Sequence, residues 1–332
     1  MDTEQFKAFA VTEQNGEFIQ QIVSKSAKDL GKGDVVINVK YSSLNYKDVL
    51  SITGNKGVTR KYPHTPGIDA SGIVEDSSDS AFKKGDKVFV GGYDFGMNTP
   101  GGFSQYVKVP SEWITKLPEN LTLKESEIYG AAGFTAAYSL YKLESAGLNP
   151  PSGKILVTGA TGGVGSMAVA ILAKAGYKPV AATGKSEKHS YLKKLGAVEV
   201  IDRNQVDDTS GKALLKEKWA AVIDTVGGNI LATAIKSAKY GASVTTCGMV
   251  QSPVLEMTVF PFILRGANLL GIDSAKCPRK TRDILWQKIA GDWKIQSLDL
   301  ICNECSLEQL DEKIDLMLTG KNTGRVVVNL DM

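Results

Sequence analysis

The distribution of apolar and polar residues divides the chain into two regions. Up to about residue 120, short apolar runs rich in β-branched and aromatic residues alternate with Gly, Pro and Asp turns, a pattern typical of β-strands. These runs are VVINVKYSS at 35–43, IDASGIVE at 68–75, KVFVGG at 87–92 and FSQYVKVP at 103–110. We therefore predict a mainly β domain in the first part of the chain.

From about residue 122 the pattern becomes helical. Apolar residues recur at helical spacing in residues 122–144, and Thr122 followed by Glu125 resembles a capping box. Strand-like runs then alternate with helical segments, which predicts a doubly wound parallel sheet. These runs are ILVTGA at 155–160, KPVAATG at 178–184, VEVID at 198–202, AAVIDTVG at 220–227 and ASVTTCGM at 242–249.

Residues 280–332 predict a pair of helices and a closing strand. RVVVNL at 325–330 is the candidate strand, and we expect it to return to the first domain. A length of 332 residues exceeds the size at which one hydrophobic core stops growing. The patterns and the length together predict an α/β chain with two domains.

A glycine-rich turn opens the second region. The strand Lys154–Val157 runs into ATGGVG at 160–165 and then into an apolar helix, the order that a dinucleotide-binding turn requires. Gly162 would let the backbone approach a pyrophosphate, and Gly165 would let the helix pack tightly on the strand. The alternative is a tight turn without a ligand. The predicted cofactor contacts of this turn are Thr161, Gly162, Gly163 and Val164.

The next strand end indicates which dinucleotide binds. An NAD site would carry Asp or Glu about 20 residues after the turn, but this chain has Thr183, Gly184 and Lys185. A hydroxyl, a small residue and a cation suit the 2'-phosphate of NADPH, so NADPH is the predicted cofactor. Arg203 is a second candidate for that phosphate. The alternative interpretation of Lys185 is an ordinary solvated lysine.

Composition excludes several other classes of protein. With 42% hydrophobic residues, 23% charged residues and a net charge of +3, the chain resembles an ordinary globular protein without a nucleic-acid surface. No apolar run approaches the ~20 residues that span a bilayer, and the N-terminus lacks a signal pattern, so we expect a cytoplasmic protein without membrane contact. Four cysteines agree with a reducing compartment, and Cys302 with Cys305 are expected to be packing thiols.

Seven motifs in order identify a family resemblance. They are SSLNYKD (42–48), PGIDASG (66–72), AAGFTAA (131–137), VTGATGGVG (157–165), IDTVGG (223–228), PFILRG (261–266) and LLGIDS (269–274). The chain resembles, nearly end to end, the zinc-free quinone oxidoreductases of the medium-chain dehydrogenase/reductase superfamily, of the YhdH/YhfP and acryloyl-CoA reductase type. The resemblance implies a GroES-like catalytic domain (1–124 and 276–332), a Rossmann NADPH-binding domain (125–275) and a homodimer that pairs through the GIDS strand.

The resemblance also implies the kind of reaction. Zinc enzymes of the superfamily bind zinc through Cys, His and Cys at positions that correspond to Asn45, Ile68 and Ala132, and Ile and Ala cannot ligate zinc. Without a Lewis acid, alcohol oxidation is disfavoured, whereas hydride addition to an electron-poor acceptor needs no metal. We expect a reductase of α,β-unsaturated thioesters such as acryloyl-CoA. The alternatives are a quinone reductase and a non-catalytic NADPH-binding sensor or structural protein.

Three neighbouring residues carry the expected catalytic roles. In the family, the segment around Tyr46 faces the nicotinamide, where a phenol can contact the cofactor and donate a proton. Asn45 is the expected neutral hydrogen-bond partner, and Asp48 the residue that orients it. The alternative for Tyr46 is a packed aromatic ring whose hydroxyl bonds the backbone.

The remaining candidates are residues with an expected structural role, a possible substrate contact and further contacts of the cofactor. Asp69 is expected to bond the turn at Gly67 or Gly72. His64 is assigned no catalytic part, and Arg60 anchors an acidic substrate tail or forms a surface ion pair. Thr135, Cys247 and Ile272 are the expected further contacts of the cofactor.

Overall fold

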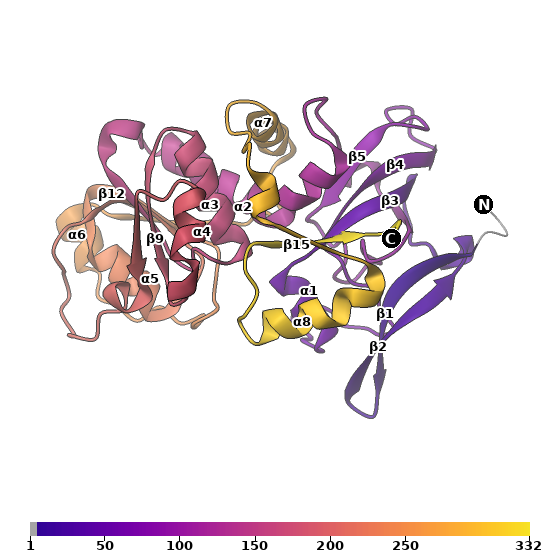
Figure 1. The fold of residues 1–332 in the computed structure, drawn as a ribbon, viewed down its shortest axis with the longest axis horizontal. Coiled ribbons are helices and arrows are strands. Elements are labelled where there is room, and N and C mark those ends of the chain that lie inside the picture. The colour runs from indigo at the N-terminus through magenta and orange to yellow at the C-terminus, as the bar shows by residue number, and fades with distance from the viewer. Residues whose placement is uncertain (1–4) are drawn as a thin grey trace. The chain divides into compact units, whose positions relative to one another are not determined.

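The computed structural model describes residues 5–332 (Figure 1). They form two compact units, one made of the described residues up to Ala131 together with Cys302–Met332, the other of Ala132–Ile301. This division differs from the domain bounds implied by the resemblance, because residues 125–131 belong to the first unit and residues 276–301 to the second. Residues 276–301 belong to the second unit because they pack against it: the ring of Trp286 lies 6.0 Å from the ring of Phe134, a residue of that unit.

The first unit contains the mainly β region that the alternating runs predict. Its seven-stranded sheet has the order β14-β15-β3-β4-β5-β7, with β6 also paired to β3, and a separate hairpin pairs β1 with β2. Its strands are β1 (Phe6–Gln14), β2 (Glu17–Lys25), β3 (Val35–Leu44), β4 (Asp69–Ser77), β5 (Lys87–Gly91), β6 (Tyr106–Val109), β7 (Ile114–Lys116), β14 (Cys302–Cys305) and β15 (Arg325–Asn329). Its helices are α1 (Tyr46–Ile52) and α8 (Leu310–Leu318).

The end of the chain returns to this sheet, as its pattern predicts. β15 pairs antiparallel with β3, with Val326 opposite Leu44. The apolar side chains of β15 are buried, and Val326 and Val328 belong to the hydrophobic core of this unit. β14, whose residues are CNEC, was not predicted, since its polar sequence carries no strand pattern; it exists because β15 provides a parallel partner.

Helix α2 (Leu123–Ser145) begins with the predicted capping box: Glu125 N–H donates to Thr122 Oγ1 (3.1 Å), and Thr122 N–H donates to Glu125 Oε2 (2.8 Å). The helix is interrupted at Gly130, whose backbone has φ 48° and ψ −156°. A Cβ at this position would lie 2.6 Å from Arg325 Nη2 and 2.8 Å from Asp69 Oδ2. Only glycine permits both the left-handed φ and this close approach to charged side chains.

The second unit contains a parallel six-stranded sheet of order β10-β9-β8-β11-β12-β13. In chain order this is 3-2-1-4-5-6, the doubly wound arrangement that the alternating strands and helices predict. The strands are β8 (Lys154–Val157), β9 (Lys178–Thr183), β10 (Glu199–Asp202), β11 (Trp219–Asp224), β12 (Ala238–Thr246) and β13 (Asn268–Gly271). The helices are α3 (Gly163–Lys174), α4 (His189–Lys194), α5 (Gly228–Lys236), α6 (Phe260–Arg265) and α7 (Arg279–Ala290).

The order of the strands positions the candidate site of this unit. The strand order reverses between β8 and β11, and ligands of such sheets bind outside the carboxyl ends of the strands at that point. α3 begins there, directly after β8. Across residues 5–332, none of the helices is both long enough and apolar enough to cross a membrane.

Candidate functional site

The glycine-rich turn joins β8 to α3 in the second unit. Gly162 is the N-cap of α3, and Ala160 N–H donates to Ala182 O (3.1 Å), which ties the turn to the end of β9. A Cβ at Gly165 would lie 2.3 Å from Gly159 O, so this glycine permits the close packing of helix and turn. The predicted contacts Gly163 and Val164 form the first turn of α3, where backbone N–H groups have no acceptor within the helix.

Two buried threonines order the neighbouring strand end. Thr161 Oγ1 and Thr183 Oγ1 lie 3.3 Å apart, and Lys185 N–H donates to Thr183 Oγ1 (3.1 Å). Both threonine side chains are buried. They therefore hold the Thr183–Lys185 loop beside the glycine turn.

Two cations lie at the carboxyl ends of β9 and β10. Arg203 packs directly against Gly184, because a Cβ there would meet Arg203 Nε at 2.8 Å. Lys185 is half-buried, and this burial lowers its pKa. The one carboxylate at the end of β10, Asp202, caps the following turn by accepting from Asn204 N–H (2.8 Å). The structure thus brings the two predicted phosphate-binding cations to adjacent strand ends.

Asp224 is a buried residue of this unit to which the sequence analysis assigned no role. It accepts from Thr158 Oγ1 (2.7 Å), Gly227 N–H (3.0 Å) and Thr246 Oγ1 (3.1 Å). These bonds join the carboxyl ends of β8, β11 and β12. Burial raises the pKa of Asp224, and the same hydrogen bonds oppose that rise. An acidic residue ending an apolar strand, in IDTVGG, was the available signal.

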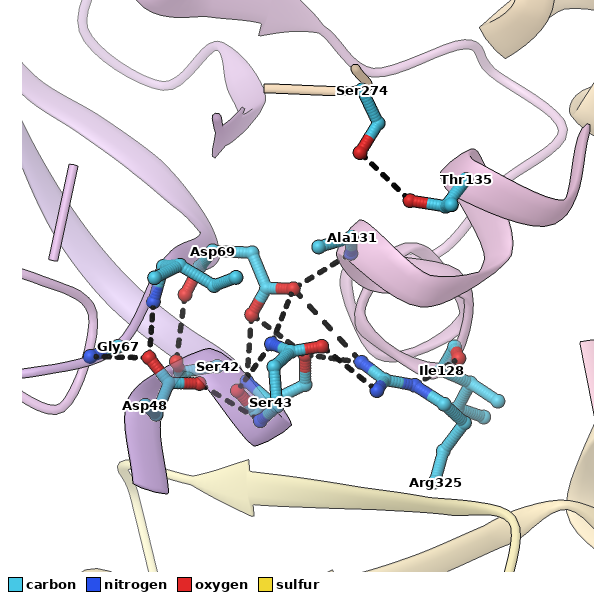
Figure 2. A network of polar contacts seen from close by, with 12 residues as sticks. Ser42, Ser43, Asp48, Gly67, Asp69, Ile128, Ala131, Thr135, Ser274 and Arg325 are labelled. Atoms are coloured by element: carbon cyan, nitrogen blue, oxygen red, sulfur yellow. Dashed lines mark hydrogen bonds and ion pairs between the residues drawn. The ribbon is translucent and has the colours of Figure 1, made fainter. Parts of the chain in front are cut away.

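Two of the other expected cofactor contacts of this unit follow the ends of strands, and the third belongs to α2. Cys247 follows β12, and its N–H donates to Asp224 O (3.1 Å); burial raises the pKa of its thiol to about 12. Ile272 follows β13, and its N–H donates to Thr246 O (3.1 Å). Thr135 Oγ1 donates to Ser274 Oγ (2.8 Å), which links α2 to the segment after β13 (Figure 2).

The expected catalytic residues lie where β3 meets α1 in the first unit. Tyr46 is the first residue of α1 and is 46% exposed, so the structure does not support the alternative of a packed ring. Asn45 precedes it and is buried. Asp48 accepts from the backbone N–H of Asn45 (2.8 Å), so it supports the chain at Asn45 and not its amide.

The Asn45 amide is oriented by two other residues, which Figure 2 shows together with Ser43. Asn45 Nδ2 donates to Asp69 Oδ2 (3.1 Å), and Arg325 Nη1 donates to Asn45 Oδ1 (3.0 Å). Asp69 also accepts from Ser43 Oγ (2.6 Å) and Ala131 N–H (2.7 Å). Both ends of the Asn45 amide are therefore held by charged groups.

The expected role of Asp69 was wrong. Asp69 bonds neither Gly67 nor Gly72; Gly67 N–H and Ile68 N–H instead donate to Asp48 Oδ1, at 3.1 and 2.9 Å. The reason is that the side chain of Asp69, the first residue of β4, points toward β3 and Ala131. Burial, followed by the charge of Asp69, raises the pKa of Asp48 to about 7, and its three backbone N–H donors oppose that rise.

Arg325 is a further residue that the sequence analysis missed. It is 2% exposed, and it lies 280 residues from Asn45 in the chain. A basic residue at the start of the otherwise apolar strand RVVVN was the signal available in the sequence. Its Nε donates to Ile128 O (3.1 Å), so one guanidinium links β15, β3 and α2.

The other singled-out residues lie outside this network. His64 is buried, with Nε2 2.9 Å from Gly96 O, an arrangement that fits a structural imidazole. Arg60 is exposed. Among residues 5–332, none of the four cysteines forms a disulfide, and no three His, Cys, Asp or Glu side chains gather in a group that could hold a metal ion.

The chain is similar to known oxidoreductases along nearly its whole length. The alcohol dehydrogenase GroES-like domain matches residues 31–119, and the zinc-binding dehydrogenase family matches residues 163–290. Acrylyl-CoA reductase AcuI of Ruegeria pomeroyi is 43% identical, covering 96% of this chain and 97% of its own. The crystal structure of Bacillus subtilis yhfP with NAD bound has TM-score 0.96 and 43% identity, covering 98% of this chain and 100% of its own. The yhdH oxidoreductase from Salmonella enterica in complex with NADP has TM-score 0.94 and 37% identity, covering 97% and 99%.

Proposed function

We propose that this chain, which belongs to the zinc-free medium-chain dehydrogenase/reductases of the YhdH/YhfP and acrylyl-CoA reductase type, reduces the C=C bond of an α,β-unsaturated thioester such as acryloyl-CoA. The protein is an NADPH-dependent oxidoreductase of that family. The observation that carries the thioester proposal is the doubly held amide of Asn45 beside the exposed phenol of Tyr46. The phenol offers a neutral hydrogen-bonding group to an acceptor that is already electron-poor, and the held amide fixes the start of α1, which carries it.

When bound, NADPH supplies the hydride. The N–H groups of Gly163 and Val164 would bind its pyrophosphate at the positive end of the α3 dipole. Lys185 and Arg203 would bind its 2'-phosphate, which NAD lacks. The Salmonella relative binds NADP and the Bacillus relative binds NAD in their crystal structures, so the likeness alone does not decide the cofactor. We assign the preference of this chain for NADPH to Lys185 and Arg203.

The cofactor assignment is tested by reversing one charge. Lys185→Glu should weaken NADPH binding about ten- to a hundredfold, the value of one charge-assisted hydrogen bond, and leave NADH binding nearly unchanged. Lys174→Glu, an exposed lysine at the end of α3, is the matched control. Equal weakening of both cofactors by Lys185→Glu would refute the assignment to the 2'-phosphate.

Tyr46 is the proposed proton donor or hydrogen-bond donor to the enolate that hydride addition generates. Asn45 would orient the neighbouring Tyr46, because its amide hydrogens are committed to Asp69 and Ser43 O, and Asp48 would hold the backbone N–H of Asn45. Tyr46→Phe should lower kcat and spare NADPH affinity. Unchanged turnover would remove this role from Tyr46.

Quinone reduction is the second candidate reaction, because a quinone also accepts hydride without a metal. NADPH oxidation with acryloyl-CoA and with 1,4-benzoquinone distinguishes the two. Turnover with benzoquinone alone would favour the quinone reductase. Turnover with neither acceptor would favour a non-catalytic NADPH-binding protein.

The proposed assembly is a homodimer formed by the second unit. β13 lies at the edge of its sheet, and exposed strand edges pair readily with another chain. Exposed apolar side chains around it support a second copy of this chain as the partner: Met249, Val250, Val259, Ile263 and Leu264. Light scattering should give twice the 35.6 kDa chain mass.

A charge at this surface tests the dimer. Ile263→Lys should shift the protein toward monomer, whereas Leu318→Lys on α8 of the first unit should leave it dimeric; the two side chains are 67% and 52% exposed. A monomeric wild type would refute the assembly. A cytoplasmic location is also proposed, and it is supported by four cysteines that form no disulfide among the described residues.

A further inference from the structure

Glu127, in the first half of α2, is an unusual buried carboxyl. Its side chain is fully buried, and among residues 5–332 no donor bonds either of its oxygens. An ionised carboxylate without donors is strongly disfavoured in a protein interior. The sequence gives no functional signal for this residue, which lies inside an apolar helical pattern.

The polar groups around Glu127 are committed elsewhere. Ser43 Oγ donates its one hydrogen to Asp69 Oδ1 (2.6 Å). Arg325 donates to Ile128 O, Asn45 Oδ1 and Ser43 Oγ, and its Nη2 lies 3.9 Å from Asp69 Oδ2. Ser43 and Asp69 are the side chains within hydrogen-bonding reach of Glu127, and because the Ser43 hydrogen is committed, Asp69 remains as its partner. Two carboxyls form such a bond only if one of them carries a proton.

The distribution of donors shows which carboxyl needs that proton. The buried cluster contains three carboxyls, Asp48, Asp69 and Glu127, and a single guanidinium, Arg325. Asp48 accepts three backbone N–H groups. Asp69 accepts two N–H groups, the Ser43 hydroxyl and the Asn45 amide. Glu127 accepts none, so an added proton costs least there.

We propose that Glu127 carries a proton, donates it to Asp69, and by remaining neutral keeps the guanidinium of Arg325 bonded to Asn45. An ionised Glu127 would compete with Asn45 Oδ1 for Arg325, because a carboxylate is the stronger acceptor. Glu127 is thus a positioning residue that acts through Arg325 on Asn45. Its kinetic consequence rests on the proposed function, since it requires Asn45 to take part in turnover.

The electrostatic surroundings agree with this placement of the proton. Burial, followed by the charge of Asp69 and the hydrogen bond with it, raises the pKa of Glu127 well above its ordinary value, and the charge of Arg325 and the hydroxyl of Ser43 oppose that rise. The other titratable groups that act on Arg325 are Asp48 on α1 and the Cys302 thiol on β14. Arg325 is the only cation among the groups that act on Glu127 within the described chain.

Infrared spectroscopy of the full-length protein tests the proton directly. The difference spectrum between the wild type and Glu127→Gln at neutral pH should contain the C=O stretch of a protonated carboxylic acid, and this band should disappear at alkaline pH. Glu119→Gln, an exposed control in the first unit, should give no such band. Absence of the band from the Glu127→Gln difference would overturn the proposal, and this readout needs no substrate.

The pH dependence of kcat tests the positioning role. At alkaline pH the kcat of the wild type and of Glu119→Gln should fall about tenfold or more, because Arg325 leaves Asn45. A misplacement of about 1 Å near the reacting groups can lower the rate up to about a hundredfold. Glu127→Gln, which remains neutral and can still donate to Asp69, should lack this loss while matching the wild type at neutral pH. An unchanged alkaline loss in Glu127→Gln would overturn the role.

A second variant separates positioning from stability. Glu127→Met is apolar and of similar size, and replacing a buried polar group in this way often leaves stability unchanged or raised. It should keep the melting temperature, lose the alkaline effect and lower kcat less than Asn45→Ala does. A parallel fall in melting temperature and kcat would show a merely structural residue. Failure of turnover in every variant, with the infrared band present, would refute the proposed function and leave the proton on Glu127.

Discussion

Gly162 and Gly165 offer a matched test of the dinucleotide turn, because each would gain one methyl group as alanine and the two methyl groups meet different surroundings. A Cβ at Gly165 would lie 2.3 Å from Gly159 O, whereas a Cβ at Gly162 would lie 3.3 Å from the same oxygen. The first distance is about 1 Å shorter than an ordinary van der Waals contact, and the second is nearly ordinary.

Gly165→Ala should therefore destabilise the cofactor-free protein. Forcing a methyl group into a packed site costs about 1–3 kcal/mol, and the better helix propensity of alanine returns up to about 1 kcal/mol. For a unit of this size, a net loss of about 1 kcal/mol corresponds to a fall of roughly 2–4 °C in melting temperature. NADPH affinity should also fall, because the start of α3 must move.

Gly162→Ala should have the opposite profile. Its methyl group meets no severe contact, so the melting temperature without cofactor should change by about 1 °C or less. The methyl group would nevertheless stand where the backbone must approach the pyrophosphate, so the NADPH Kd should rise about tenfold or more. Differential scanning fluorimetry and calorimetric titration with NADPH measure the two quantities. Wild-type affinity in Gly162→Ala would refute the placement of the pyrophosphate, and wild-type stability in Gly165→Ala would refute the packing argument.

Three further predictions concern the first unit and the absence of metal ligands. Gly130→Ala should lower the melting temperature, because alanine is strained at φ 48° and would press on Arg325 and Asp69; thermal unfolding measures the loss, with Glu119→Gln as the neutral control. The pKa of Asp48 is raised to about 7 in the folded protein, so the folded state holds its proton more tightly, and stability to urea should fall as pH rises from about 4 to about 7. Asp48→Asn has no carboxyl to titrate at this position, so its stability should fall less over this range, and an equal fall in Asp48→Asn and the wild type would contradict this origin. Because Ile68 and Ala132 cannot ligate zinc, prolonged dialysis against a chelator should leave NADPH oxidation unchanged, and lost activity restored by zinc would disprove the metal-free reaction.

Much of the fold follows from local patterns in the chain. Several strands of each sheet, the capping box at Thr122 and the order strand, glycine turn, helix at residues 154–175 depend on residues close in sequence. The same holds for the cations at Lys185 and Arg203, since parallel strands place their carboxyl ends at one edge of the sheet. Periodicity and turn chemistry act over short distances, so these features could be predicted.

The polar cluster around Asn45 could not be predicted from the sequence. Asn45 and Arg325 are 280 residues apart, and nothing local indicates that Arg325 holds the Asn45 amide or that Asp69 bonds Ala131 and not Gly67. The partner of a buried side chain depends on which strands become neighbours and on where a helix is broken, as α2 is at Gly130. The sequence by itself determined the elements and the dinucleotide turn. Only the tertiary structure decided which buried charges meet, because that choice depends on packing between distant segments.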